Sequence, residues 1–477
     1  MKKTKNASET SHEKQHENFV RQQNERCFLK DKQKIQYHSF ILLEIVPLEK
    51  INQLISGIDK LYANVSISQE SRLNYKNILS DCHSKLFQWN TLNLPYITTS
   101  KLKGEVLPDC AFHDLGDKIR HMHISIYKVL PSSVILQIQV YLDDKISKKI
   151  NDTIYKYHKE ISEPLETPKG KYTNIYGPER QKKLEIYQLR KELHKEAIDF
   201  LNIYFKGYFF ELSKGYISVV PSIDLFSLDY PEKEDELLDW GIENSGFFHC
   251  FSTCIIPWDS FKYENYLFCF ESERDIEFEN YVIFANRKTS TDDIYSDIDS
   301  AIEEGLNFCS FDLIAIDRWV RTQESVVGKL NFTVSEEILK IQENKFSKAI
   351  ETRKVVLKSV FSFERFGAEY KEYCFIPDKF PYKSLKDKKN PERQIDLFKG
   401  LKEGIDTRIK EINNLIDGFT RQYETILNLK SLEFSKNMQT KVFTLTIVVI
   451  VLAILQTIIL IDSKIPELII KLLFGGC

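Results

Sequence analysis

Two histidines, His121 and His123, stand two residues apart in a stretch that alternates polar and apolar side chains. Because alternate side chains of a strand point to the same face, both would share a face with Tyr127. Gln137 and Gln139 occupy equivalent polar positions beyond a predicted turn. Imidazoles can transfer protons, and with neighbouring amides they can bind a ligand, so this face is a candidate ligand-binding wall. The alternative is the solvated face of a two-faced sheet.

A second group of chemically capable side chains comprises His249, Cys250, Cys254 and Cys269. Nitrogen and sulfur atoms bind zinc, but zinc sites usually contain the paired spacing Cys-x-x-Cys, which these residues lack. We therefore expect buried structural thiols here. An acidic run at 292–304 could gather a cation, yet acidic residues also favour the first turn of a helix. The sequence predicts no metal site.

A basic cluster precedes the C-terminal helical region and contains Lys386, Lys388, Lys389 and Arg393. Such a cluster could bind a small phosphorylated ligand or an acidic neighbouring subunit, and the alternative is an exposed linker. A straight helix from this cluster to the apolar segment near the C-terminus would be about 70 Å long, compared with a Debye length of about 8 Å. Lipid headgroups are therefore not the expected ligand.

The motifs that identify a reaction or a cofactor are absent from the sequence. It contains no Gly-rich phosphate loop, no His-Glu-x-x-His and no Gly-x-Ser-x-Gly. No catalytic residue is predicted, and the cofactor stays unassigned. Lys and Arg number 66 against 69 Asp and Glu, so the formal charge of −3 gives no reason to expect nucleic acid as a partner. The nine cysteines lack the spacing of a disulfide scaffold, which favours a reducing compartment.

The candidate residues need a folded domain to position them, and residues 37–390 carry the pattern of a mixed α/β (α+β) domain. Residues 1–36 are almost wholly polar and predict a disordered tail. A stretch with Pro and Gly at 163–178 is a candidate internal boundary. Alternating or apolar runs predict strands at 40–46, 216–220, 247–256, 266–270 and 281–284 and a hairpin at 121–142; helical spacing predicts helices at 143–161, at 186–204 and within 297–366.

Residues 391–441 predict a long helical stalk, because apolar residues recur there with the 3-4 spacing of a heptad repeat. The seam either lies between copies of the chain in a coiled coil or packs onto the domain of the same chain. The predicted oligomer interface comprises Phe398, Ile405, Ile409, Ile412, Ile416, Phe419, Tyr423, Ile426 and Gln456.

Residues 442–461 are uncharged and long enough for a helix to cross the roughly 30 Å hydrocarbon layer of a bilayer. Lys430, Lys436 and Lys441 precede this segment, and the positive-inside rule then predicts a cytoplasmic N-terminal domain on a single-pass protein of the bacterial inner (plasma) membrane. Gln456 lies inside the segment and needs a hydrogen-bonding partner, such as the span of a second copy. Residues 462–477 predict a short apolar tail that lies in the interface or re-enters the membrane.

An N-terminal α/β domain followed by a long helix that runs into a C-terminal membrane span resembles the plan of CorA-type divalent-cation channels and of CorA-like effectors in prokaryotic antiviral systems. The resemblance covers topology from about Phe40 onward. CorA channels have a Gly-Met-Asn signature and a second span, whereas this span is followed by Asp-Ser-Lys-Ile-Pro at 462–466. The resemblance implies a membrane-anchored oligomeric sensor-effector, in which a cytoplasmic domain receives a ligand or partner and the membrane end acts as a channel or perturbs the bilayer. The alternatives are a tail-anchored enzyme and a structural membrane adaptor.

Overall fold

The computed structural model describes residues 2–63, 77, 79, 92–99, 110–167, 170–213, 219–257, 259–263, 265–270, 281–287, 311–341, 361, 363–372, 382–390 and 392–461. The chain divides into two units, Met1–Glu324 with Phe361–Ile409 and Ser325–Val360 with Lys410–Cys477. The predicted acidic run at 292–304 and the predicted C-terminal tail at 462–477 lie outside the described residues.

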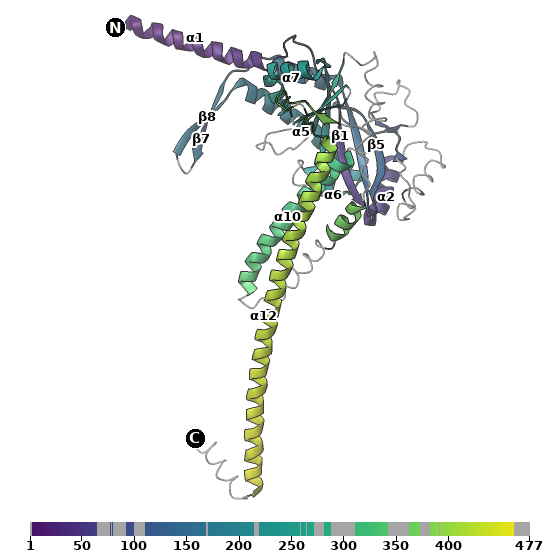
Figure 1. Cartoon of the computed structure of the whole chain (residues 1–477), viewed down its shortest axis with the longest axis vertical. Helices are drawn as coiled ribbons and strands as arrows, with labels where there is room; N and C mark the ends of the chain where they lie inside the picture. The colour runs from purple at the N-terminus through teal and green to yellow at the C-terminus, as the bar shows by residue number, and fades with distance from the viewer. Residues whose placement is uncertain are drawn as a thin grey trace. The chain divides into compact units, whose positions relative to one another are not determined.

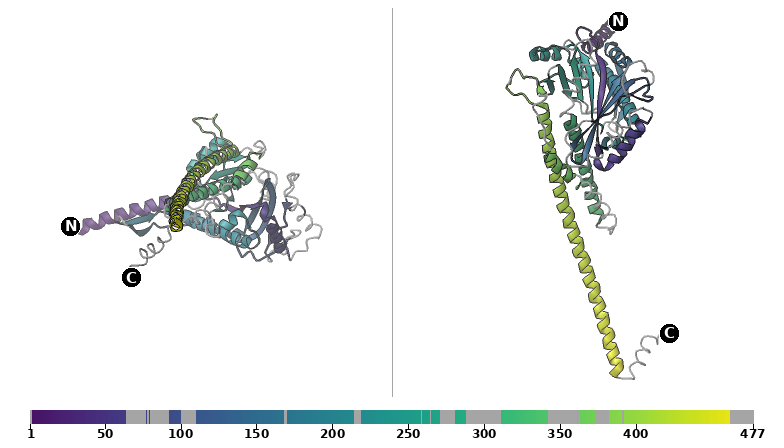
Figure 2. Two further views of the ribbon diagram at one scale, coloured as in Figure 1. Left: turned by 90° about the horizontal axis from the view of Figure 1, so that it is seen from below. Right: turned by 90° about the vertical axis from the view of Figure 1, so that its right-hand side faces the viewer.

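The first unit is built on an 11-stranded mixed sheet, in which β13, β10, β11, β12, β9, β1, β6, β5, β3 and β4 follow one another and β2 pairs with β5 (Figures 1 and 2). The fold is therefore mixed α/β, as the sequence predicted. The strands are β1 (Gln36–Pro47), β2 (Leu92–Asn93), β3 (Ile97–Thr98), β4 (Ala111–Phe112), β5 (Ile119–Leu130), β6 (Ser133–Leu142), β9 (Ser222–Leu228), β10 (Ser260–Tyr263), β11 (Tyr266–Phe270), β12 (Tyr281–Asn286) and β13 (Lys383–Ser384).

The centre of the sheet is buried on both faces. β1 and β6 pair antiparallel from Ser39 with Tyr141 to Pro47 with Ser133, and every residue of β6 is buried. The predicted hairpin at 121–142 is confirmed as β5 and β6, which pair across a two-residue turn. Strands buried on both faces carry near-continuous apolar sequence, and the run at 40–46 has this property.

Helices surround the sheet (Figure 2). Among them, α4 and α6 contact β1, and α2 contacts α5. The helices whose bounds the structure describes before residue 311 are α1 (Lys2–Arg26), η1 (Leu48–Lys50, a 3-10 turn), α2 (Ile51–Leu61), α4 (Asp144–Tyr155), α5 (Pro178–Tyr204), α6 (Tyr208–Leu212), α7 (Glu234–Glu243) and α8 (Ser245–His249).

A carboxylate, Glu44, occupies the middle of the buried strand β1 and is fully buried. It accepts hydrogen bonds from the backbone N–H groups of Ile45 and Phe209, each at 2.8 Å, and from that of Phe210. Burial raises the pKa of Glu44 to about 8, despite these backbone hydrogen bonds. A side chain at Gly207 would collide with Glu44, so a glycine is required where the chain enters α6. Glu44 thus holds α6 against the sheet.

The N-terminal segment corrects the prediction of a disordered tail. Residues Lys2–Arg26 form α1, which extends away from the sheet (Figure 1). Asn24 at its end is buried; it donates to the carbonyl of His158 at 2.9 Å and accepts from the N–H of His158 at 2.8 Å. Cys27, Leu29 and Ile35 are also buried. These tertiary contacts offset the low hydrophobicity of the segment, which the local sequence could not indicate.

Two other predictions are wrong in detail. The break at 163–178 contains a two-stranded hairpin, β7 (Ile161–Thr167) with β8 (Gly170–Tyr176), which projects from the body of the unit (Figure 1). The predicted strand at 247–256 instead begins as the short helix α8 and continues as turns. Its run of aromatic residues is buried as a helical cluster around Phe247, Phe248 and Phe251, whose rings contact one another.

Among the helices whose bounds the structure describes, α10 (Phe311–Ile341) and α12 (Leu397–Ile461) have residues in both units. The single helix α12 has 65 residues and covers both 397–441 and 442–461. Its stretch Phe434–Thr457, with a mean hydropathy of 2.2 and no residue buried inside the chain, is long and apolar enough to cross a membrane.

Candidate functional site

The candidate site lies where the sheet changes direction. β9 and β12 run parallel, with Ser227 beside Ala285 and Leu228 beside Asn286, whereas β1 runs antiparallel to β9. The carboxyl ends of two strands therefore meet the beginning of a third. In open α/β sheets, ligands bind in the crevice outside the carboxyl ends of the strands, and β9 and β12 both end at this edge.

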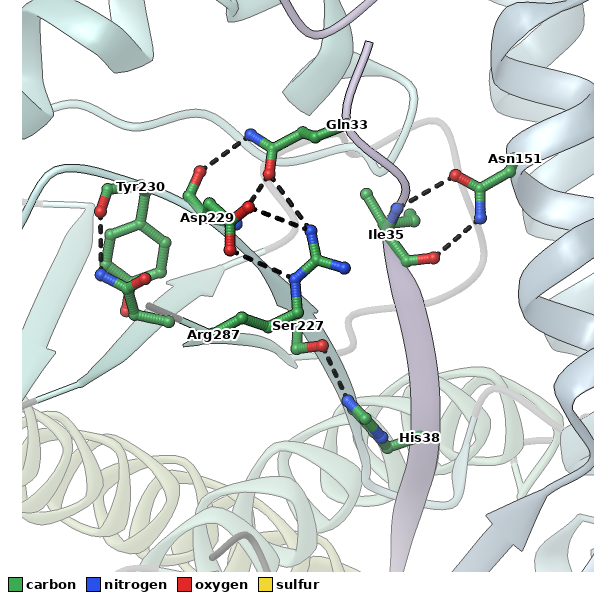
Figure 3. Close-up of polar contacts among 9 residues, drawn as sticks. Gln33, Ile35, His38, Asn151, Ser227, Asp229, Tyr230 and Arg287 are labelled. Atoms are coloured by element: carbon green, nitrogen blue, oxygen red, sulfur yellow. Dashed lines mark hydrogen bonds and ion pairs between the residues drawn. The ribbon is translucent and has the colours of Figure 1, made fainter. Parts of the chain in front are cut away.

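Three polar side chains from distant parts of the chain meet at this edge (Figure 3). The amide of Gln33 donates to the carbonyl of Asp229 at 2.8 Å, and its oxygen accepts from the Asp229 N–H at 2.8 Å. Arg287, the residue after β12, donates through Nε to Asp229 Oδ1 at 3.3 Å and through Nη2 to Asp229 Oδ2 at 3.4 Å. Arg287 Nη2 also donates to Gln33 Oε1 at 3.4 Å. The side chains of Arg287 and Asp229 are 23% and 35% exposed, so the pair is accessible from solvent.

Beneath this pair, His38 and Ser227 form a buried couple (Figure 3). The register between β1 and β9 shifts between Tyr37 and Ser39, and His38 lies in this irregularity. His38 Nε2 and Ser227 Oγ are 2.8 Å apart. Burial, with a smaller contribution from the positive charge of Arg287, lowers the pKa of His38 to about 4. The imidazole is therefore neutral at pH 7.

The backbone around the site is held by further hydrogen bonds (Figure 3). Asn286 donates to the carbonyl of Tyr230 at 2.8 Å, and Tyr230 donates its hydroxyl hydrogen to the carbonyl of Asn265 at 2.7 Å. The side-chain amide of Asn151 makes two hydrogen bonds with the backbone of Ile35: it accepts from the N–H at 3.0 Å and donates to the carbonyl at 2.7 Å. Because both strand ends and the entry to β1 are fixed, the polar side chains are preorganised.

This arrangement is suited to binding a polar or anionic ligand. Arg287 provides a guanidinium that can form bidentate hydrogen bonds with a carboxylate or phosphate. Its loose pairing with Asp229 can be exchanged for a ligand. Ser227 is fully buried, and its hydroxyl oxygen lies against the neutral imidazole of His38. In the part of the chain that the structure describes, no group of three or more His, Cys, Asp or Glu side chains could hold a metal ion.

A charged network lies deeper, between β1, β9 and α5. Asp224 on β9 is fully buried and accepts from Arg190 Nε at 2.7 Å and from the hydroxyl of Tyr37. His194 Nε2 lies 3.0 Å from Asp224 Oδ1. Burial alone would raise the pKa of Asp224, but the charges of Arg190 and His194 outweigh it and hold that pKa well below its usual range. Since none of these side chains reaches solvent, the network fixes α5 on the sheet.

The predicted ligand wall on β5 and β6 is packed and is not a solvated face. Gln137 and Gln139 are each only 3% exposed, and Gln139 donates to Ser39 Oγ at 3.3 Å. His121 stacks on Tyr141 at a ring-centroid distance of 4.1 Å, and His123 stacks on Tyr96 at 4.8 Å.

The two predicted histidines therefore lie among aromatic rings. Burial lowers the pKa of His123 to about 4. Tyr127 lies opposite Ile135 and is half-buried. The structure places the predicted residues on one face of β5 and β6, but the two glutamines on that face are buried. This face is therefore neither a ligand-binding wall open to solvent nor a solvated face of the sheet.

The predicted basic cluster contacts acidic side chains of the same chain. Lys388 Nζ lies 2.7 Å from Asp239 Oδ1 on α7, and the Lys386 N–H donates to Glu234 Oε2 at 3.4 Å. Lys389 and Arg393 lie in the turn beside them, where the Lys389 N–H donates to Asp387 at 2.9 Å and that of Arg393 to the carbonyl of Asn390 at 3.1 Å. The cluster is thus partly neutralised within one chain.

Five of the nine residues of the predicted oligomer interface are buried within the chain itself, namely Phe398, Ile405, Ile409, Ile412 and Ile416. These positions accord with the alternative that the seam packs onto its own chain. The side chains of Phe419, Tyr423 and Ile426 lie outside the description, although their backbone is helical. Gln456 is exposed.

The histidine and the cysteines at 249–269 do not form one cluster. His249 Nδ1 lies 3.2 Å from Glu179 Oε1, while Cys250 and Cys269 are buried.

The residues at the carboxyl edge of β9 and β12 were not predicted as a site. Polar residues after an apolar strand were the available signal: Asn286 and Arg287 stand at the end of β12 and just after it, and the apolar part of β12 at 281–284 was predicted as a strand. No family model, no curated protein and no solved structure matches this chain.

Proposed function

We propose that this protein is a membrane-anchored sensor-effector: its α/β domain binds a polar or anionic ligand at the carboxyl edge of β9 and β12, and α12 carries the response to the membrane. The observation that carries the proposal is the continuity of α12. One helix begins inside the α/β domain at Leu397 and contains the apolar stretch Phe434–Thr457. At the helical rise of 1.5 Å per residue it is about 100 Å long.

The beginning of α12 is attached firmly to the domain. The Leu397 N–H donates to the carbonyl of Tyr382 at 2.8 Å, and the ring of Phe398 packs edge-on against Tyr382 at 5.8 Å. Further along, Arg408 Nη1 donates to Glu324 at 3.2 Å and Arg408 Nε lies 3.8 Å from Asp317. A movement of the sheet edge would therefore displace the start of the helix.

A contiguous series of contacts links the candidate site with this attachment. Tyr230 follows Asp229 and donates its hydroxyl hydrogen to the Asn265 carbonyl in the turn between β10 and β11. On β11, Phe268 contacts the ring of Tyr382 at 5.7 Å, and Tyr382 contacts α12. These packed side chains provide a physical route by which a change at the site reaches α12.

The resemblance in plan to CorA-like proteins supports the further proposal that several copies assemble around the spans and alter membrane permeability, as a channel or by perturbing the bilayer, in antiviral defence. In the described part of the span, the hydroxyls of Thr444, Thr446 and Thr457 donate to carbonyls four residues earlier, at 2.8 to 2.9 Å. No such bond is found for Gln456 in the described part of the chain. A side chain that needs partners in hydrocarbon favours association of spans.

The test is expression of the full chain in bacteria while membrane potential is followed with a voltage-sensitive dye. We expect the intact chain to depolarise cells, and a matched variant with residues 442–461 replaced by an unrelated apolar span to remain in the membrane without depolarising them. Arg287→Ala should reduce the effect, whereas Lys388→Ala, which breaks an exposed ion pair, should not.

A different outcome would assign another role. If the chain with the unrelated span depolarises cells as well as the intact chain does, the span serves as an anchor only, and a tethered enzyme or adaptor becomes the better proposal. If Arg287→Ala is folded by thermal melting and fully active, the carboxyl edge of β9 and β12 is not the sensing site.

A further inference from the structure

Two cysteines 223 positions apart in sequence are brought together behind α5. Cys27 follows the last residue of α1, and Cys250 follows the last residue of α8. The two helix ends approach unusually closely, because a Cβ atom at Gly246 would lie 2.5 Å from the carbonyl oxygen of Arg26. Only glycine permits this approach without a shift of the backbone.

The two thiols are neighbours and are both buried. Cys27 Sγ lies 3.4 Å from the carbonyl oxygen of Gln23, and Cys250 Sγ lies 3.3 Å from that of Gly246. Each thiol thus shares its surroundings with the other and with the helix that carries it. A disulfide requires Cα atoms within about 7 Å of each other, and the close approach of Gly246 to Arg26 brings the two cysteines near one another.

A buried ammonium group lies beside the pair. Lys182 on α5 is 0% exposed; its Nζ donates to the carbonyl of Ile154 and lies 4.5 Å from the ring centroid of Phe28, the neighbour of Cys27. In the described residues, no carboxylate lies within ion-pair distance of Lys182 Nζ. A buried cation is costly unless an anion compensates it, and a thiolate at Cys27 would do so.

The electrostatics make the two sulfurs unequal. A hydrogen bond from Cys250, together with the charge of Lys182, lowers the pKa of Cys27 despite its burial. The same hydrogen bond, together with burial, raises the pKa of Cys250 well above its usual value. Cys27 is therefore the nucleophile of the pair and Cys250 the resolving thiol.

We propose that Cys27 and Cys250 are a redox-responsive pair that forms a reversible disulfide with peroxide. The Cys27 thiolate attacks one oxygen of hydrogen peroxide, the O–O bond breaks, and Cys27 becomes a sulfenic acid while hydroxide leaves. The Cys250 sulfur then attacks the Cys27 sulfur, the S–O bond breaks, and the Cys250 proton and the departing hydroxide form water. Two thiols and one peroxide thus give one disulfide and two waters, and the sulfurs supply both electrons.

The disulfide would tie the end of α1 covalently to α8. In the reduced protein the segment after α1 is held by non-covalent contacts, including the reciprocal hydrogen bonds between Asn24 and His158. Oxidation would make the release of α1 and residues 28–35 from the domain impossible without breaking the chain or the bond. The pair therefore controls whether the N-terminal segment can detach.

The experiment uses the full chain, purified reduced in detergent, treated with hydrogen peroxide, alkylated with N-ethylmaleimide and digested for mass spectrometry. We expect a linked peptide that joins Cys27 and Cys250 and disappears on reduction. Cys269→Ser, the matched control at another buried thiol, should leave the linked peptide unchanged. Lys182→Met keeps the length of the side chain and should slow formation about tenfold, because the thiolate of Cys27 loses the nearby positive charge.

The wild-type result decides the proposal even if a cysteine variant fails to fold. Recovery of alkylated Cys27 and Cys250 without a linked peptide, after peroxide has oxidised other thiols of the same sample, would overturn it. Oxidation of Cys27 to sulfinic acid with Cys250 still alkylated would also overturn it. An unchanged rate in Lys182→Met would remove the role of the ammonium. None of these outcomes depends on the membrane effect, so the two proposals fail separately.

Discussion

The guanidinium of Arg190 on α5 is bonded to the carboxylate of Asp224 on β9 in a site that water does not reach: Arg190 Nε donates to Asp224 Oδ2 at 2.7 Å, and the residues are 4% and 0% exposed. This pair, with His194 and Tyr37 around the same carboxylate, attaches the 27-residue helix α5 to the centre of the sheet. It is part of the fold and not of the candidate site.

Removing one partner of this pair should destabilise the protein severely, because the other charge is left buried and uncompensated. For Asp224→Ala we expect a loss of about 3–5 kcal/mol and a decrease in Tm of roughly 5 °C or more. Glu196→Gln, which breaks the exposed pair with Lys118, is the matched control and should cost less than about 1 kcal/mol. Thermal melting followed by near-UV circular dichroism measures both, and equal Tm values for the two variants would contradict this assignment.

Stability should decrease in mild acid because of buried histidines. Burial lowers the pKa of His123 to about 4, below its unfolded value of about 6.5. Between these two pH values His123 is protonated in the unfolded chain and neutral in the folded chain. The stability of the fold is therefore retained above about pH 6.5 and is lost as the pH falls towards 4. For His123 this amounts to no more than about 3 kcal/mol.

The variant His123→Gln should flatten the dependence of Tm on pH between 6.5 and 4. His38, whose pKa is also lowered to about 4, should leave part of the slope in place. His249→Gln is the control, because the pKa of His249 is raised by its hydrogen bond with Glu179 and its loss should not reduce the acid sensitivity. An unaltered slope in His123→Gln would show that the imidazole is protonated inside the fold.

The full chain should sediment with membranes and resist extraction by alkaline carbonate, because Phe434–Thr457 is long and apolar enough to span a bilayer. A chain cut after Lys430 should be released into the soluble fraction. Extraction of the full-length protein by carbonate, with a resident membrane protein retained in the same sample, would reject a spanning segment.

Association of copies should depend on the exposed part of α12. Met438 is 47% exposed, whereas Ile412 is buried within the chain. We expect a cysteine at position 438 to cross-link between copies in membranes under mild oxidation and a cysteine at position 412 not to do so. Gln456→Leu should weaken the cross-link at 438, because hydrogen bonds between spans contribute about 0.6–2 kcal/mol each.

Wild-type protein gives the background of its own cysteines in this assay. Purely monomeric protein for the position 438 variant in membranes would reject the homo-oligomer. Cross-linking at position 412 as efficient as at 438 would instead restore the seam from Phe398 onward to an intermolecular role.

Local sequence was enough wherever a segment forms its structure from its own neighbours. The uncharged stretch at 442–461, the heptad-spaced residues before it and the alternation across 121–142 each predicted an element that the structure contains. These are short-range properties, since helical periodicity, strand alternation and the length of an apolar helix depend on adjacent residues. The helix at 186–204 was predicted for the same reason, and α5 extends it back to Pro178.

Tertiary structure alone decided which residues meet. Gln33, Asp229 and Arg287 come together only because β9 and β12 pair in parallel and β1 enters beside them, a pairing between segments more than 50 residues apart. The glutamines of the predicted wall became core residues because the sheet is covered on both faces at β6. Cys27 and Cys250 meet because the chain after α1 is buried against α8, in a segment whose polar composition predicted disorder. Contacts of this kind depend on the three-dimensional neighbours of a residue, which adjacent residues in one sequence do not specify.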